Sequence, residues 1–473
     1  MARRDRVPAT RVDQAVSHTR TGHLGGFVEE LRRHERFQAF VRAFPARARV
    51  SEPVTALLVA ALHAELERSV LLLLPEDADA RDVAEGASWF LGSDSVALLP
   101  SRGVGLASGL EPPPHLVGER FRALDVLASG GLVCASAIAL SEGLPPVSAR
   151  PDAVRLRVGD EPGLDALAEM LALAGYERVD RVDERGQFAV RGGIVDVFPT
   201  TGREPLRVEL FGDEIEQVRA FSPFTQRALH AVPDALVYPA AERRRDLVEA
   251  SRGDDGRDVA PPSDLVPPVD EAPTLVWQPD EVRRVWEEEG LRPLDLHEAA
   301  ELDPFPRGQA HAFEAQRPAI AARGISEAEN ELAGFVRSGN RVVVSFAHRG
   351  EALRQQAMLR RVDAELLDET GAIPRDAGVR FAVAPARRGF VWRELGLVLL
   401  PDTQVFRKKP PRADTRLGRA LASFAELRVG DHVVHEDHGV GKLIEFETKE
   451  VAGVTRDYLH LAIKGEDRLS VPH

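Results

Sequence analysis

Three histidines near the end of the chain form a pattern that suggests a metal site. His432, His435 and His438 are interleaved with two carboxylates, Glu436 and Asp437. Imidazole nitrogens and carboxylate oxygens are common ligands of zinc and other transition metals. The flanking residues read as strands, however, so successive side chains point to opposite faces and the three rings do not converge. The sequence therefore favours a turn between strands over a metal centre.

The same segment is the nearest approach to a phosphate-binding loop. Such a loop reads G-x-x-x-x-G-K-[ST], and its backbone amides surround the phosphates. This segment supplies Gly441 and Lys442, but its first position is Glu436, which repels phosphate, and its last is a leucine. Ahead of the helix expected over 55–68, residues 51–54 read S-E-P-V, with no glycine or lysine. We therefore expect no bound nucleotide or other cofactor in this chain.

Other catalytic chemistries find no support in the residue types present. The single cysteine, Cys134, excludes an internal disulfide and a thiolate metal cluster, and it fits a reducing cytoplasm. No G-x-S-x-G elbow marks a serine nucleophile. We expect no active site within these residues.

Charge and hydropathy narrow the range of partners. Lys and Arg total 61 against 75 Asp and Glu, a formal charge of −14, which makes the chain a poor free-standing DNA binder. One basic stretch, containing Arg407, Lys408, Lys409 and Arg412, lacks interleaved aromatics and is typical of a soluble linker. The longest apolar runs are strand-sized, and no apolar segment follows the basic N-terminus. We expect a cytoplasmic protein without membrane contact.

The segments around these residues predict the architecture. Between residues 55 and 140, apolar helices alternate with short, continuous apolar strands. This pattern is typical of a mainly parallel sheet with helices on both faces. The expected helices cover 55–68, 77–91 and 118–129, and the expected strands cover 70–74, 95–100 and 131–140.

From residue 160 the pattern becomes antiparallel. A helix over 163–175 is followed by alternating runs on either side of Gly192-Gly193 and of Gly212-Asp213. Because glycine tolerates the positive φ of tight turns, both pairs predict β-hairpins. A second small α/β unit begins near residue 326, and the last segment is β-rich with glycine turns.

Two segments resemble a known family. Residues 176–229 contain R-G-G-I-V-D-V-F-P and F-G-D-E-I-E, and resemble the UvrA-binding module shared by UvrB and bacterial transcription-repair coupling factors. Residues 429–472 contain V-V-H-E-D-H-G-V-G and D-Y-L, and resemble the RNA-polymerase-interacting domain of coupling factors, which CarD-type regulators also contain. The first α/β segment resembles the degenerate helicase-like domain of the family. The later α/β unit, with R-R-G-F at 387–390, resembles its small third domain.

The resemblance implies a multidomain α/β and α+β fold with a fixed order of parts. They are a degenerate, helicase-like parallel α/β domain (1–155, similar to domain 1A of UvrB), an inserted antiparallel UvrA-binding α+β module (156–240), a segment similar to domain 1B of UvrB with a Pro-rich loop (241–330), a second small α/β domain (331–402), a basic linker (403–425), and a small β-barrel of the CarD or Tudor type that binds RNA polymerase (426–473).

The resemblance also implies a UvrA-binding surface. Arg178 and Arg191 are expected to face UvrA and to donate charge-assisted hydrogen bonds to its carboxylates. Along the expected strand, Ala189 and Arg191 share one face, while Phe188 and Val190 share the other. Phe188 is a further candidate, either as an apolar contact for UvrA or as a core residue. UvrB has an arginine where this chain has Ala189.

A second binding surface is expected near the C-terminus. The run 443–451 alternates and predicts an edge strand, whose unpaired backbone groups can pair with a strand of a partner. The resemblance implies that this partner is the β subunit of RNA polymerase. The contact candidates are Ile444, Phe446, Thr448 and Lys449, the last standing where the family can carry an apolar anchor.

Full-length members of the family continue into an ATP-driven DNA translocase of helicase superfamily 2, which uses ATP and Mg²⁺ and makes most of the contact with DNA. This sequence stops at V-P-H, within the polymerase-binding module, so we expect a chain cut before that motor, and its status as an enzyme stays open. The predicted function is transcription-coupled nucleotide-excision repair, by recognition of stalled RNA polymerase and recruitment of UvrA. The alternatives are a UvrB-like or helicase-like NTPase, for which the phosphate loop is missing, and a stand-alone CarD-type regulator, which leaves the UvrA-binding module unexplained.

Overall fold

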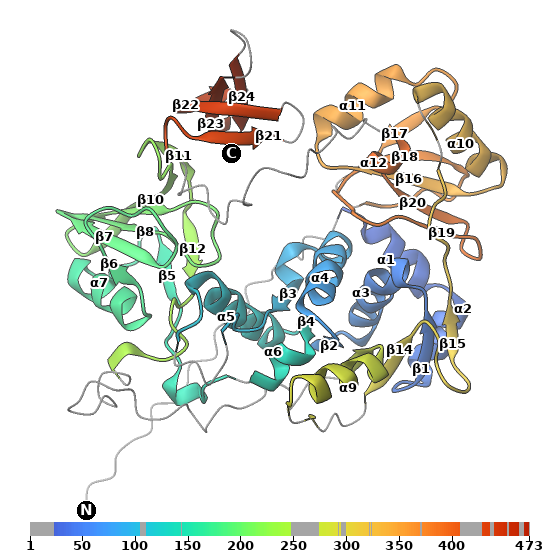
Figure 1. Cartoon of the computed structure of the whole chain (residues 1–473), viewed down its shortest axis with the longest axis horizontal. Helices are drawn as coiled ribbons and strands as arrows, with labels where there is room; N and C mark the ends of the chain where they lie inside the picture. Colours follow the sequence, from blue (N-terminus) through green and yellow to red (C-terminus); the bar gives the residue numbers. More distant parts are fainter. Residues whose placement is uncertain are drawn as a thin grey trace, which may run out of the picture.

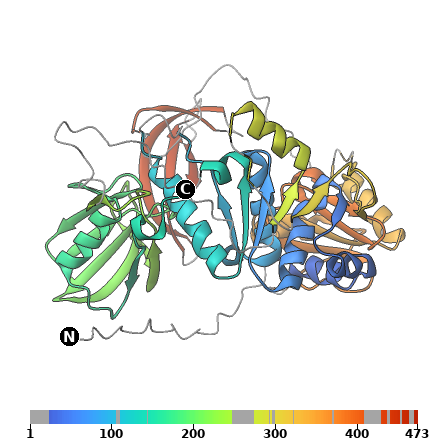
Figure 2. The ribbon, with the colours of Figure 1, turned by 90° about the horizontal axis from the view of Figure 1, so that it is seen from below.

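The protein is described here by a computed structural model of its 473 residues. The described residues are 23–104, 110–142, 144–246, 274–291, 293–294, 299–320, 322, 324–368, 371–406, 428–435, 439–451, 454–462 and 468–472. A parallel α/β domain lies in the middle, between an antiparallel module at one end and a second α/β domain at the other (Figures 1 and 2). The C-terminal sheet lies beside the antiparallel module (Figure 1).

The first domain is built on a seven-stranded sheet with the order β15-β1-β14-β13-β2-β4-β3. All its described pairings are parallel, which confirms the predicted sheet. Three strands come from residues 274–313, so part of the predicted 241–330 segment completes the first sheet instead of standing apart. The strands are β1 (Arg47–Val50), β2 (Val70–Leu74), β3 (Val96–Leu99), β4 (Leu132–Ser136), β13 (Thr274–Trp277), β14 (Ala300–Asp303) and β15 (His311–Phe313).

Helices cover both faces of this sheet, as its uniformly apolar strands require. In β2, Leu72 and Leu74 join the core on one face, and Leu71 and Leu73 join the core on the other. The first face packs against α1 (Gly25–Arg32), α2 (Glu35–Arg42), α3 (Thr55–Leu66) and α4 (Asp77–Leu91). The second packs against α5 (Pro114–Ala128), α6 (Ala137–Glu142) and α9 (Pro279–Glu288).

The strand predicted over 131–140 is shorter in the structure and is followed by a helix. It ends at Ser136, and α6 begins at Ala137. The Ser136 hydroxyl accepts a hydrogen bond from the backbone N–H of Ala139 at 3.0 Å. This contact satisfies an amide that the first turn of a helix leaves without a partner, so the apolar run changes from strand to helix there.

The antiparallel module has a six-stranded sheet with the order β11-β10-β9-β8-β7-β6. Both predicted hairpins are present, and Gly192 has the positive φ of +60° that its turn requires. Helix α7 (Leu164–Leu173) packs Leu167 and Leu171 into the core of the module. The strands are β6 (Glu177–Arg178), β7 (Gln187–Arg191), β8 (Ile194–Val197), β9 (Leu206–Phe211), β10 (Glu214–Phe221) and β11 (Ala228–Ala231). The entering β5 (Val154–Arg157) pairs with the leaving β12 (Asp234–Val237).

The second α/β domain has a five-stranded sheet with the order β17-β18-β16-β20-β19, in which only β19 is antiparallel to its neighbour. The Phe406 ring packs near Phe346 and Phe381, so the domain extends past the predicted bound at 402. Its elements are α10 (Ile325–Arg337), β16 (Arg341–Phe346), α11 (Arg349–Met358), β17 (Ala364–Leu366), β18 (Gly378–Val383), β19 (Phe390–Trp392), β20 (Leu397–Pro401) and α12 (Asp402–Val405).

The C-terminal β domain is confirmed as a four-stranded antiparallel sheet, β21 (His432–His435), β22 (Gly439–Val451), β23 (Val454–Ala462) and β24 (Arg468–Pro472). His432 and His435 are the first and last residues of β21, three positions apart. Residues 436–438 and the basic stretch 407–412 lie outside the described residues. Within the described part of the chain, no helix has the length and apolarity to cross a membrane.

Candidate functional site

The predicted UvrA-binding arginines lie on neighbouring strands of the antiparallel module. Arg178 is exposed on β6, where it pairs with Phe188 of β7 in parallel register. Arg191 ends β7, directly before the hairpin turn, and about half of its side chain is exposed. Both arginines thus lie on the two strands at one edge of the six-stranded sheet, at positions three residues apart along β7, and both are accessible to a partner.

Arg191 is held in place by a buried carboxylate. Asp196 on β8 is 1 % exposed, and its Oδ2 accepts a hydrogen bond from Nη2 of Arg191 at 2.6 Å. Arg207 on β9 donates to both oxygens of the same carboxylate, at 2.7 and 2.9 Å. The hydrogen bond to Asp196 raises the pKa of Arg207. A buried carboxylate bound by two arginines is a strong, directional arrangement, so it fixes the orientation of Arg191 before any partner arrives.

Asp196 and Arg207 were missed as functional residues from the sequence. Asp196 lies in the R-G-G-I-V-D-V-F-P tract and Arg207 in the alternating run before Gly212, and the register pairs Asp196 with Ala189 and with Arg207. Alternation alone puts Ala189, Arg191 and Asp196 on one face of the hairpin, so the signal was present in the strand pattern.

Phe188 is a core residue, which corrects its placement among the contact candidates. Its side chain is 1 % exposed and joins Leu167, Leu171 and Tyr176 in the core of the module. The predicted division of faces along β7 is correct. Strand alternation does not indicate which of the two faces a helix covers. In the structure, α7 covers the face that carries Phe188.

The predicted edge strand is present in β22. Residues Lys442–Val451 of β22 pair with β23, whereas β21 pairs only with Gly439–Lys442. Leu443 exchanges backbone hydrogen bonds with Gly430 and Asp431. From Ile444 onward, β23 is the one strand among the described ones that pairs with this segment, so its other backbone edge is open to a partner strand.

The four predicted polymerase contacts differ in exposure. Lys449 is exposed and Ile444 is half-buried. Phe446 and Thr448 point to the other face from Lys449, and both contact the antiparallel module: the Phe446 ring stacks on Phe224, and the Thr448 hydroxyl is hydrogen-bonded to that of Thr225. The structure therefore brings this segment together with the antiparallel module, a contact that the sequence did not predict.

A second polar group lies on the opposite face of β22. Glu445, Glu447 and His460 have ligand atoms within 4.8 Å of one another. The His460 Nε2 lies 2.9 Å from Glu447, and its Nδ1 lies 3.0 Å from the Ser470 hydroxyl. The Lys449 ammonium lies 2.8 Å from Glu447 and lowers the pKa of that carboxyl. Because Glu447 already has these partners, cross-strand ion pairing accounts for the group.

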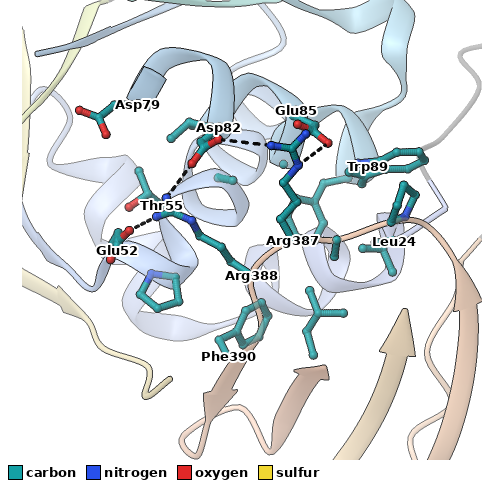
Figure 3. A pocket seen from close by; sticks show the side chains of 18 of the residues that line it. Leu24, Glu52, Thr55, Asp79, Asp82, Glu85, Trp89, Arg387, Arg388 and Phe390 are labelled. Carbon is teal, nitrogen blue, oxygen red and sulfur yellow. Dashed lines mark hydrogen bonds and ion pairs between the residues drawn. The ribbon is translucent and has the colours of Figure 1, made fainter. Parts of the chain in front are cut away.

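The place expected for a phosphate loop holds paired charges instead. The short 3₁₀ turn η1 (Glu52–Val54) precedes α3, and Glu52 pairs with Arg388. Arg388 also lies 2.6 Å from Asp82, and Arg387 lies 3.1 Å from Glu85. These side chains line a cavity of about 90 Å³ between the two α/β domains (Figure 3). Both arginines are already paired with carboxylates. The cavity therefore has little free positive charge to bind a chain of phosphates.

The two domains that form this cavity share a continuous core. Phe27 of α1 packs edge-on against Phe390 of β19, with ring centroids 5.6 Å apart. Phe390 belongs to the R-R-G-F tract whose two arginines reach across the cavity (Figure 3). That tract therefore joins the first domain to the second.

Two family models match the modules described above. The UvrB interaction domain matches residues 154–242, and the CarD-like/TRCF RID domain matches residues 427–473. Transcription-repair-coupling factors match about nine tenths of the chain. The protein from Bacillus subtilis (strain 168) is 24 % identical over 518 residues, and the protein from Mycobacterium bovis is 28 % identical over 535 residues. One from Staphylococcus aureus (strain USA300) is 23 % identical over 523 residues. The chain is therefore similar to transcription-repair-coupling factors along most of its length.

The chain matches an N-terminal portion of these coupling factors and spans less than half of their length. The matches cover 90, 89 and 92 % of this chain but only 44, 43 and 45 % of the respective relatives. The matched UvrB interaction domain covers the whole antiparallel module with β5 and β12, and the matched RID domain covers the C-terminal sheet. The two predicted docking modules are therefore the parts with independent family support.

Proposed function

We propose that this chain is a docking scaffold for transcription-coupled nucleotide-excision repair. It binds UvrA through Arg178 and Arg191 of the antiparallel module. It binds the β subunit of RNA polymerase through the open edge of β22 around residues 444–449. The observation that carries the proposal is the presence of both matched modules in one chain, with Arg178, Arg191 and Lys449 accessible and the backbone edge of β22 open from Ile444 onward among the described strands.

The proposal extends to what the rest of a coupling factor supplies. ATP and Mg²⁺ act in the translocase portion of full-length members, which also makes most of the contact with DNA and displaces the polymerase. The residues of this chain recognise UvrA and the polymerase β subunit. The complex of the three proteins acts in the cytoplasm. A stand-alone CarD-type regulator would use residues 427–473 only and would leave the UvrB interaction domain without a role.

The test is a direct binding measurement with the whole chain. We expect immobilised chain to bind purified UvrA and, separately, a fragment of the polymerase β subunit. Replacing Arg178 and Arg191 with alanine should weaken UvrA binding by about 2 kcal/mol per arginine, roughly thirty-fold each, because charge-assisted hydrogen bonds are lost. Polymerase binding should stay unchanged in this variant.

A matched control separates this surface from general charge effects. Arg283 and Arg284 on α9 are two neighbouring arginines with 61 % exposed side chains, far from both modules in the fold. Alanine at both positions removes the same charge and should leave UvrA binding intact. Equal losses in the two double variants would overturn the assignment of the UvrA surface.

A further inference from the structure

A turn of the antiparallel module lies against the strand that carries the predicted polymerase contacts. The Phe224 ring stacks on Phe446 with centroids 4.3 Å apart and ring planes 2° apart. The hydroxyls of Thr225 and Thr448 are hydrogen-bonded to each other. At the same boundary β11 lies against β23 (Figure 1). These contacts cover the face of β22 opposite to Lys449.

The turn is built to present these two side chains. Ser222 is fully buried, and its hydroxyl accepts hydrogen bonds from the backbone N–H groups of Phe224 at 3.2 Å and Thr225 at 3.0 Å. Gln226 adopts a left-handed φ of +61°, and its N–H donates to the Ser222 carbonyl at 2.8 Å. Because both backbone and side chain fix its shape, the turn meets β22 with little further loss of conformational entropy.

The turn is also connected to the predicted UvrA contact. The Arg207 guanidinium lies 3.4 Å from the side-chain oxygen of Gln226 and binds the buried Asp196. Asp196 in turn holds Arg191. A side chain that orients the UvrA surface thus also supports the turn that contacts the C-terminal sheet.

We infer that residues 222–227 form an internal docking surface for the C-terminal sheet of this same chain and compete with RNA polymerase for the face of β22 around Phe446 and Thr448. The identity of the external competitor rests on the proposed function. A strand that pairs with the open edge from Ile444 onward places its side chains beside these two residues, where the turn now lies. The apparent affinity for polymerase is then the intrinsic affinity reduced by the fraction of undocked chain.

A reversible cross-link tests the contact in the whole chain. The native Cys134 is fully buried, so the thiols introduced by Thr225→Cys and Thr448→Cys are the two that meet at this boundary. We expect oxidation to join them, since their hydroxyls already touch. The oxidised chain should bind a polymerase β fragment roughly ten-fold more weakly than the same chain after reduction. Thr225→Cys with Ser338→Cys, a position at the end of α10 in the second α/β domain, is the control pair and should stay unjoined.

A second variant tests the competition without a cross-link. Phe224→Ala removes one ring of the stack and should tighten polymerase binding roughly three- to ten-fold. Phe305→Ala, which removes a ring that is 90 % exposed on the first domain, should change nothing. A disulfide yield no higher than that of the control pair, or equal polymerase affinity in the oxidised and reduced states, would overturn the inference. If the reduced chain binds no polymerase, the proposed function fails, while the disulfide yield still decides whether the turn docks.

Discussion

Replacing Arg120 with methionine should destabilise the first domain strongly. Arg120 is fully buried on α5. Its Nε lies 3.2 Å from Glu242, and its Nη1 lies 3.6 Å from Glu142 and donates to the Pro100 carbonyl at 2.7 Å. Glu242 follows the last strand of the antiparallel module. This arginine therefore connects the end of that module to the first domain.

The size of the loss follows from the charges that remain. Arg102 still pairs with Glu242 through Nε at 2.9 Å, and its backbone N–H still donates to Glu142 at 2.7 Å. Removing one partner of a buried ion pair costs about 3–5 kcal/mol, because the other charge stays buried. Methionine keeps the apolar contacts of the arginine stem. We expect the free energy of unfolding of the domain to fall by about 3 kcal/mol at pH 8.

The stability lost in Arg120→Met should depend on pH, because Glu142 titrates near neutral pH. Burial raises the pKa of Glu142 to about 7, even though Arg102 and Arg120 act in the opposite direction. Since this folded-state value lies above the ordinary value of 4.5, the carboxyl binds its proton more tightly in the folded state. That contribution to stability is complete below about pH 4.5 and is lost as the pH rises through about 7. Without the charge of Arg120 the pKa rises further, so the deficit of the variant should be larger at pH 8 than at pH 6.

The assay is urea unfolding at both pH values, followed by hydrogen exchange in α5, because a chain of several domains has no single global transition. Arg81→Met on α4 removes an exposed arginine and should cost less than about 0.5 kcal/mol. A deficit in Arg120→Met that equals this control, or that shrinks between pH 6 and pH 8, would contradict the role of Arg120 as the buried partner of Glu142 and Glu242.

Three further substitutions have defined outcomes. Asp196→Asn removes the carboxylate that orients Arg191 and should lower UvrA affinity about five-fold in a binding titration; unchanged affinity would contradict the orienting role. Gly175→Ala places a Cβ 2.7 Å from the backbone nitrogen of Ala241 at a φ of +88°, so thermal unfolding should show a loss of stability of about 2 kcal/mol or more. An unchanged stability would be inconsistent with that packing. Lys449→Leu supplies an apolar side chain on the open edge and should raise affinity for the polymerase β fragment several-fold, as interferometry would show; weaker binding would count against that edge as the contact.

The sequence predicted the elements whose signals are local. The apolar run at 70–74 became β2, the helix over 77–91 became α4 with the same bounds, and glycines marked both hairpins of the antiparallel module. The short strands β1, β14 and β15 were not predicted. They are three or four residues long, and β1 pairs with β14 and β15 across more than 250 residues of the chain. Such long-range pairing has no periodic signature in a single sequence.

The candidate site was predicted in part. Strand alternation correctly separated the face of Phe188 from the face of Arg191, but it carries no information on which face the helix covers, and Phe188 proved to be core. The stack of Phe224 on Phe446 joins parts of the chain more than 200 residues apart, and each ring by itself reads as an ordinary aromatic. Contacts between domains depend on surface complementarity, which only the folded structure reveals.

The central claim is that one chain binds both partners through separate surfaces. The most direct test immobilises UvrA, loads the chain on it, and then adds a fragment of the polymerase β subunit. We expect the fragment to bind only where the chain has been loaded, and the Arg178→Ala, Arg191→Ala double variant to abolish this signal by failing to load. A chain that binds the β fragment in solution but never associates with UvrA, with both arginines intact, would contradict the account.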